Sequence, residues 1–239
     1  MGILQIDRIV TAVYVLAAVL PAAFLMRYIY RQDRVERESP LLLASLVLCG
    51  ILAALASVVL EKIGGTLLDM LARDRGKTYV ILLAFLVIGA VEEGTKLFFL
   101  KLRTWKNPEF NYRFDGVVYS VFVSLGFAAV ENIGYVFEYG LSVALPRALL
   151  AVPAHMGFAV FMGAFYGRAK QCETWMDDIG VKINLWVGYV AAVLLHGFYD
   201  ACTMTGTSLA TMLFVAFVVI MYWVVIRLIH REARTDRPV

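Results

Sequence analysis

The stretch LLLASLVLCGILAALASVVL, residues 41–60, runs for twenty positions without a charged side chain. A bilayer core about 30 Å thick is crossed by roughly 20 residues of α-helix, so this stretch predicts a transmembrane helix. The whole chain has the same character, because 61% of its 239 residues are hydrophobic and only 17% are charged. Soluble domains are about 45–50% apolar and about 25% charged. A soluble enzyme, a disordered protein and a disulfide-rich secreted domain are therefore excluded.

Seven apolar segments of this kind fill the chain. They lie at about 9–30, 41–60, 79–100, 115–137, 147–167, 183–203 and 207–229. The gaps between them are too short for an independent domain, so we expect an all-α, polytopic membrane protein with a single transmembrane domain over residues 1–239. The gap at 61–78 mixes leucines with charges, and we expect it to form a short amphipathic helix along the membrane interface.

Lysine and arginine are distributed unevenly between the two sides of these spans. Fifteen fall on one side: Arg27, Arg31, Arg34, Arg37, Lys101, Arg103, Lys106, Arg113, Arg168, Lys170, Lys182, Arg227, Arg231, Arg234 and Arg237. Six fall on the other: Arg8, Lys62, Arg73, Arg75, Lys77 and Arg147. Because the richer side is normally cytoplasmic, we expect a multi-pass protein of the cell membrane with its N-terminus outside and its C-terminus in the cytoplasm. The basic residues form no continuous face of the kind that binds nucleic acid.

Ionisable and polar residues interrupt four of the spans. They are Glu92, Glu93 and Lys96 in VIGAVEEGTKLFF (87–99), Glu131 and Asn132 in GFAAVENIGYVF (126–137), His155 in PAHMGFAVFMG (153–163), and His196 and Asp200 in LLHGFYDA (194–201). A central Asp or Lys costs about 2.5–3.5 kcal/mol on insertion. A fold would not carry so many such groups without a function, so we expect them to face one polar cavity between the middle and the outer face of the membrane.

Helical spacing supports this convergence. Lys96 is four residues after Glu92 and three after Glu93, so it can reach either carboxylate. Asp200 is four residues after His196 and can accept a hydrogen bond from the imidazole. Several glycines flank the polar positions and would let the helices approach closely; they are Gly94, Gly126, Gly134, Gly157 and Gly163.

Several known intramembrane chemistries lack their motifs in this chain. It has no H-E-x-x-H zinc-binding helix, no G-x-S-x-G nucleophile turn and no cysteine beside a histidine. The three cysteines, Cys49, Cys172 and Cys202, are dispersed and suggest neither a disulfide framework nor a thiolate metal site. An aspartyl pair of Asp115 and Asp200 is disfavoured because no G-x-G-D accompanies it.

The remaining motifs together resemble the PrsW family of intramembrane proteases. E-E-x-x-K at Glu92, Glu93 and Lys96 is followed by F-x-x-x-E-N from Phe127, by His155 in a glycine-rich helix, and by H-x-x-x-D from His196. The resemblance covers about residues 79–205, which we expect to be the catalytic core. It departs from the related prenyl endopeptidases, whose second motif has a histidine where Glu131 stands.

The resemblance implies a peptidase that cuts a single-span, membrane-anchored substrate, such as an anti-sigma factor, near the outer membrane face. It marks as catalytic Glu92, Glu93, Glu131, His155, His196 and Asp200, and as supporting residues Lys96, Phe127 and Asn132. We expect one glutamate of the pair to stay ionised beside Lys96 while the other acts as the general base for water. We expect His196, oriented by Asp200, to donate to the scissile carbonyl as negative charge develops.

Two alternatives remain at this stage. No cofactor is predicted, but a divalent metal such as zinc could be held by His155, His196, Glu131 and Asp200 and would then activate the water itself; we favour the metal-free, glutamic type. The same cluster could also serve as the relay of a proton-coupled transporter or channel. Against this, the chain shows no inverted repeat and no paired broken helices.

The charge distribution generates a labelling prediction. Single cysteines introduced as Glu36→Cys and Trp175→Cys, in a background without native cysteines, should resist an impermeant maleimide in intact cells. Arg75→Cys and Thr205→Cys should react with it. Labelling of positions 36 and 175 from outside would invert the proposed orientation.

Overall fold

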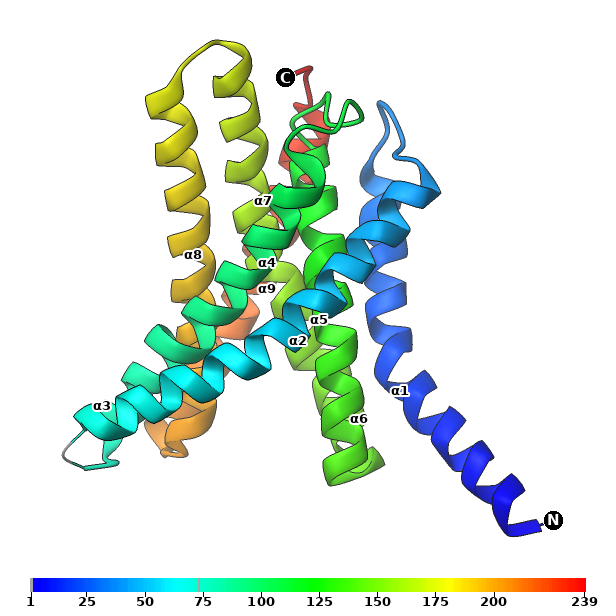
Figure 1. The fold of residues 1–239 in the computed structure, drawn as a ribbon, viewed down its shortest axis with the longest axis vertical. Helices are drawn as coiled ribbons and strands as arrows, with labels where there is room; N and C mark the ends of the chain where they lie inside the picture. Colours follow the sequence, from blue (N-terminus) through cyan, green and yellow to red (C-terminus); the bar gives the residue numbers. More distant parts are fainter. Residues whose placement is uncertain (1, 73) are drawn as a thin grey trace.

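The computed structural model describes residues 2–72 and 74–239, without the side chains of residues 2–7, and these residues are almost entirely helical. The long helices are α1 (Gly2–Gln32), α2 (Pro40–Leu71), α4 (Ala90–Thr104), α5 (Asp115–Tyr139), α7 (Val152–Thr174), α8 (Asp178–Thr205) and α9 (Ser208–Arg234). The shorter elements are α3 (Lys77–Leu82), η1 (Leu83–Gly89), η2 (Leu141–Val143), α6 (Ala144–Pro146) and η3 (Arg147–Ala151). The elements α3, η1 and α4 form one continuous helical rod, and α6 and η3 lead directly into α7 (Figure 1).

Six helices among the described residues are long and apolar enough to cross a membrane: Arg8–Gln32, Pro40–Leu71, Asp115–Tyr139, Leu141–Thr174, Asp178–Thr205 and Ser208–Arg234. The rod from α3 to α4 is the seventh helical segment. It carries the charged residues of the E-E-x-x-K motif. The predicted all-α, polytopic membrane fold is confirmed.

Helix α2 is much longer than its predicted span. It continues without a break from Pro40 to Leu71, a length of 32 residues, or about 48 Å at 1.5 Å per residue, and it crosses the bundle obliquely (Figure 1). The expectation of a separate interfacial helix over 61–78 is therefore wrong. The Gly64–Gly65 pair does not end the helix. A Cβ at Gly64 would lie only 3.0 Å from Val87 Cγ1, so this glycine allows α2 to pack closely against η1.

Local sequence signals explain where the helices begin. The Ser39 side chain accepts the Leu42 N–H and precedes a proline at the first helical position of α2. The side chains of Asp177 and Thr207 likewise accept a backbone N–H at the starts of α8 and α9. Asp115 is the first residue of α5, where a carboxylate complements the helix dipole, and its Oδ2 accepts the N–H groups of two preceding loop residues.

Helices α5 and α7 form the centre of the bundle. In an apolar 18-residue stretch of α5, 78% is buried within the protein, compared with 11% in the corresponding stretch of α1. The two helices approach closely where Gly116 of α5 faces Gly163 and Gly167 of α7. Gly126 makes a similar approach to the backbone of α2 at Val47. The contact of Gly116 with Gly163 and Gly167 fixes the relative position of α5, which carries Glu131, and α7, which carries His155.

The loops divide between the two ends of the bundle as the alternation of spans requires. The loop at 33–39, the loop at 105–114, the turn at 175–177 and the C-terminus share one end (Figure 1). Ala72 and the segments 74–76, 140–151 and 206–207 lie at the other end. Arg73, counted among the six basic residues of that second end, lies outside the described residues. The orientation of the bundle in the membrane stays a prediction.

The glycine contact between α5 and α7 generates a stability prediction. A Cβ at Gly116 would lie 2.6 Å from Gly167 N and 2.7 Å from Gly163 O, and backbone atoms cannot move aside as a side chain can. Gly116→Ala should therefore destabilise the protein by about 1–3 kcal/mol and lower its unfolding temperature in detergent. Gly134→Ala in the same helix meets nothing within 4 Å and serves as the control. Equal unfolding temperatures for the two variants would contradict the close packing.

Candidate active site

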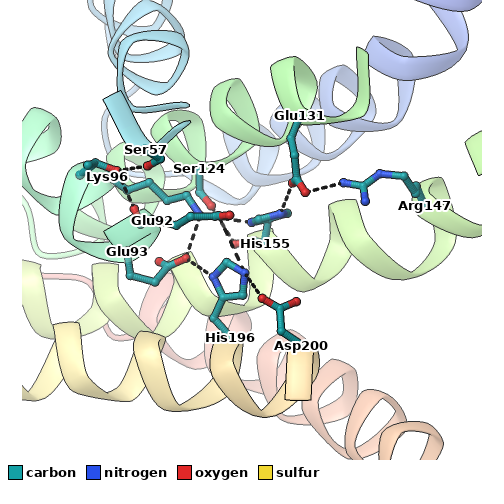
Figure 2. Close-up of polar contacts among 11 residues, drawn as sticks. Ser57, Glu92, Glu93, Lys96, Ser124, Glu131, Arg147, His155, His196 and Asp200 are labelled. Carbon is teal, nitrogen blue, oxygen red and sulfur yellow. Dashed lines mark hydrogen bonds and ion pairs between the residues drawn. The ribbon is translucent and has the colours of Figure 1, made fainter. Parts of the chain in front are cut away.

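The structure brings the predicted polar residues of four helices into one buried cluster near the centre of the bundle. Glu92, Glu93 and Lys96 come from α4, Glu131 from α5, His155 from α7, and His196 and Asp200 from α8. In Figure 2 the two glutamates, Lys96 and the two histidines point toward one another. The structure thus brings together the residues that the sequence predicted to face one cavity.

The Lys96 ammonium joins both glutamates. Its Nζ lies 2.8 Å from Glu93 Oε1 and 3.1 Å from Glu92 Oε2, and the lysine side chain is only 2% exposed. It also lies 4.0 Å from the centre of the Phe127 ring, at a distance suited to a cation–π contact. The sequence spacing predicted that Lys96 could reach either carboxylate, and in the structure it reaches both.

The π-helical turn η1 and helix α2 position this part of α4. A π-helical turn is frequent beside functional sites, and η1 ends at Gly89, directly before the helix that carries the glutamates. Thr95 Oγ1 donates to the Glu92 carbonyl at 2.9 Å and shares a 2.7 Å hydrogen bond with Ser57 Oγ of α2. Helix α2 thus holds the backbone of the glutamate pair in place.

The hydrogen bonds of His155 define its protonation pattern. Its Nδ1 lies 3.3 Å from Lys96 Nζ, and because an ammonium only donates, Nδ1 accepts. The Nε2 atom then carries the hydrogen and donates to Glu131 Oε2 at 2.8 Å. Glu131 Oε1 in turn lies 3.0 Å from Arg147 Nη2. Glu131 therefore orients His155 and is itself held by an arginine.

His196 has a different main partner from the one expected. Its Nδ1 lies 2.9 Å from Glu93 Oε1, whereas Nε2 lies 3.4 Å from Asp200 Oδ2. The predicted hydrogen bond from His196 to Asp200 is thus a longer polar contact. The imidazole stacks on the Phe158 ring, with 4.9 Å between the centroids. In this orientation Nδ1 faces Glu93 of α4.

The two predicted supporting residues outside α4 lie on the edge of the cluster. Phe127 contacts the Lys96 ammonium and lies 5.9 Å, between ring centroids, from His155. Asn132 does not touch the central groups. Its Nδ2 donates to the Ala18 carbonyl of α1, and its Oδ1 accepts from Arg147 Nε. Asn132 therefore acts on the cluster only by holding Arg147.

Sequence reasoning missed Arg147 and Glu61. Arg147 was counted only as a charge at the outer end of its span, although it pairs with Glu131. Glu61 lies beyond the predicted end of the second span, but the continued α2 brings it into the wall of the same cavity. Its position four residues after Ser57 was a usable signal, because both lie on one face of α2.

A cavity of about 800 Å³ adjoins the cluster. Its wall includes Glu92, Glu131, His155, His196 and Asp200, but not Glu93 or Lys96. Apolar residues surround these polar groups, and they include Leu55, Val58, Leu150, Met204 and Phe214. The cavity extends toward the end of the bundle that carries α6, since residues of the C-terminal turn of α5 and the start of η3 also line it. Only one glutamate of the pair thus meets the space that a substrate could enter.

Four side chains of the cluster have the arrangement of a metal-binding site. Glu92, Glu93, His155 and His196 each offer one ligand atom, and these atoms lie within 4.8 Å of one another. Glu93 Oε2 is buried without a hydrogen-bond partner among the described residues. His155 presents Nδ1 to the centre while a carboxylate holds its Nε2–H, as is common for zinc-ligating histidines. Of the four ligands predicted from sequence, the two histidines belong to this group, whereas Glu131 and Asp200 do not.

Comparison with known proteins identifies the family. A family described as "PrsW family intramembrane metalloprotease" matches residues 38–227. The chain belongs to this family. Proteins named Protease PrsW are 37% identical over 157 residues in Halalkalibacterium halodurans, covering 66% of this chain and 71% of that protein, and 31% identical over 211 residues in Clostridioides difficile, covering 87% and 86%. The Bacillus subtilis protein of that name is 32% identical over 213 residues, covering 87% and 89%. No solved structure matches the chain.

Membership of the PrsW family confirms the resemblance drawn from the motifs and makes the protein an intramembrane protease, hence a membrane peptidase. Family membership therefore favours the protease over the transporter alternative. The family description includes a metal, and the donor group of two glutamates and two histidines is chemically suited to one.

The paired glutamates generate a prediction about Lys96. Lys96→Met leaves two buried carboxylates without their shared cation, and removal of one partner of a buried ion pair costs about 3–5 kcal/mol. The variant should unfold at a clearly lower temperature in detergent, and adding Glu93→Gln should recover part of the loss. Lys101→Met, at an exposed position of the same helix, is the matched control. If Lys96→Met unfolded at the wild-type temperature, Lys96 would not be the counter-ion of the pair.

Proposed function

We propose that this PrsW protein hydrolyses a peptide bond of a membrane-anchored substrate with Glu92 as the general base. The observation that carries the proposal is the unequal position of the two glutamates. Glu92 lines the cavity, whereas Glu93 is fully buried behind it. A general base must lie within hydrogen-bond reach of the water that it deprotonates, and of the two glutamates only Glu92 meets the cavity.

Glu93 and Lys96 act as positioning residues in this proposal. Glu93 Oε1 holds both Lys96 Nζ, at 2.8 Å, and His196 Nδ1, at 2.9 Å. Lys96 keeps Glu92 at 3.1 Å and sets the orientation of its carboxylate. These contacts lie outside the cavity wall, so the two residues act through Glu92 and His196 rather than on the substrate.

His196 is the proposed donor to the scissile carbonyl. It lines the cavity, and its Nε2 is directed toward Asp200 and Glu92, at 3.4 and 3.8 Å. Because Nδ1 donates to the Glu93 carboxylate, Nε2 carries a hydrogen only when the ring is protonated and positively charged. Both distances exceed that of a strong hydrogen bond, so a substrate oxygen can compete for the Nε2–H of the charged ring. The interaction would strengthen as the carbonyl oxygen gains negative charge in the transition state. Asp200 would stabilise the charged imidazole.

A metal-assisted version of the reaction is the second candidate, and the donor group described above favours it. Glu92, Glu93, His155 and His196 would hold the ion, with Glu131 fixing the ring of His155. A zinc ion bound there would supply Lewis acidity and lower the pKa of a bound water. We favour the glutamic version because the Lys96 ammonium already contacts three of these four side chains and would repel a second cation.

The substrate we propose is a single-span membrane protein, of the anti-sigma factor kind that the family resemblance implies. An intact transmembrane helix keeps its carbonyls in internal hydrogen bonds, so the cut would fall in an extended segment beside the span. The cavity extends toward the end of the bundle that carries α6. From the distribution of basic residues we propose that this end lies outside the cell, so the cut would fall near the outer face of the cytoplasmic membrane.

The proposal predicts different consequences for the two glutamates. In liposomes containing a purified single-span anti-sigma-type substrate, Glu92→Gln should lower kcat by at least about 10²-fold with KM little changed, because Gln cannot accept the proton from water. Glu93→Gln should also lower kcat, but by less, since Gln can still accept a hydrogen bond from Lys96 or His196.

Glu173→Gln, at an exposed site remote from the cavity, is the control for loss of a carboxylate. Each variant should elute as a single species at the wild-type volume, which separates a catalytic effect from misfolding. Near wild-type cleavage by Glu92→Gln would refute its role as the base. A loss confined to Glu93→Gln would transfer that role to Glu93.

A further inference from the structure

A second cluster of carboxylates lies at the opposite end of α5 from the cavity. Asp33 follows α1, Glu38 precedes α2, and Asp115 begins α5. Each offers one oxygen, and these oxygens lie within 4.8 Å of one another. The three residues are only 2%, 5% and 1% exposed. Asp115 and Glu131 are sixteen residues apart in α5, or about 24 Å along its axis, so this group is separate from the active site.

These three carboxylates have no basic partner. None of the ion pairs among the described residues involves Asp33, Glu38 or Asp115. Arg37, from the same loop, lies instead over the Tyr30 ring, with 5.4 Å between Cζ and the ring centroid. The arrangement contrasts with Glu232, another buried carboxylate at this end of the bundle.

Glu232 receives three arginines, Arg113, Arg168 and Arg231, whose Nη2 atoms lie 3.2, 3.1 and 3.6 Å from its oxygens. Burial of an unpaired carboxylate is strongly unfavourable. Three together require a bound cation or bound protons, because no basic side chain among the described residues forms an ion pair with them.

An independent observation points to a missing ligand. Asp33 Oδ2 is buried and has no hydrogen-bond partner among the described residues. A buried oxygen left unsatisfied costs about 1–3 kcal/mol, and more when it is charged. Asp115, in contrast, accepts the backbone N–H groups of Asn111 and Tyr112 at 3.0 and 2.7 Å. The three carboxylates therefore still have an unoccupied acceptor.

The surroundings of the cluster are also acidic. The Asp236 carboxylate acts on Asp33, and the Glu109 carboxylate acts on Glu38. The surroundings therefore disfavour negative charge unless a cation compensates it.

We propose that Asp33, Glu38 and Asp115 bind a divalent cation of the Ca²⁺ or Mg²⁺ class. Carboxylate oxygens are the preferred ligands of these hard cations, whereas zinc favours nitrogen and sulfur. The cation would neutralise the cluster and provide a partner for Asp33 Oδ2. This site is distinct from the histidine-containing group of the active site in both position and ligand type.

The bound cation would join segments that are distant in sequence. It would link the loop between α1 and α2 to the start of α5. The loop at 105–114 is already tied to the C-terminal tail, because Arg113 N donates to Arg237 O at 3.1 Å and Val239 N donates to Asn111 O at 2.9 Å. Phe114 N also donates to Asp236 Oδ1 at 2.9 Å. The cation would thus complete a cross-linked cap at this end of the bundle.

Thermal unfolding of the purified full-length protein in detergent tests the proposal. After treatment with EDTA and its removal, MgCl₂ or CaCl₂ at about 5 mM should raise the unfolding temperature by roughly 5 °C, and KCl of equal ionic strength should not. Asp33→Asn should abolish the increase. Glu36→Gln, which removes an exposed carboxylate from the same loop, should retain it. Comparison of the two salts identifies the preferred cation.

Three results would overturn the proposal. One is no increase with either cation. The second is an equal increase in Asp33→Asn, which would place the ion elsewhere, such as among the active-site carboxylates. The third is stabilisation by lowering the pH from 7.5 to 5.5 with no response to cations, which would mean that the cluster holds protons. If Asp33→Asn does not fold, Glu38→Gln provides the same comparison, with titration calorimetry of the wild-type protein as a direct measure of binding.

Discussion

The contact of the Lys96 ammonium with Glu92, Glu93 and His155 is the interaction on which the rest of the active site depends. A buried ion pair is stable only where its geometry is close and the remaining polar atoms have partners. Three further helices meet this demand except at Glu93 Oε2, which has no hydrogen-bond partner among the described residues. Helix α5 supplies Phe127 against the ammonium and Glu131 to the His155 ring, α8 supplies His196 to Glu93, and α2 supplies Ser57 to Thr95. The close glycine packing of α5 on α7 positions the helices for these contacts.

Much of this arrangement could be predicted from the sequence, because charged groups in a membrane are costly enough to be informative. The apolar runs predicted the helical bundle. The spacing of Glu92, Glu93 and Lys96 predicted their pairing, and the motifs predicted the family. The apolar runs and the motifs are local features of the sequence. The pairing depends on the α-helical period, which α4 keeps from Glu92 to Lys96.

The features that were not predicted depend on contacts between helices. His196 stands four residues from Asp200, but its shortest polar contact is with Glu93, which lies on a different helix. Arg147 reaches Glu131 from the start of η3, and Glu61 reaches the cavity wall because α2 continues past its apolar run. Spacing within one span carries no information about such contacts. The distinction between Glu92 and Glu93 likewise required the cavity, since adjacent residues of identical type cannot be separated by sequence.

In the proposed reaction Glu92, held by Lys96, activates water without a metal. This is tested by the metal content of the purified protein, measured by mass spectrometry, together with cleavage of a liposome-bound single-span substrate before and after chelation. We expect less than stoichiometric zinc or other transition metal and unchanged cleavage after chelation. One zinc ion per chain, lost together with activity on chelation, restored by added zinc and absent from a His155→Ala variant, would contradict it and establish the metal-assisted reaction.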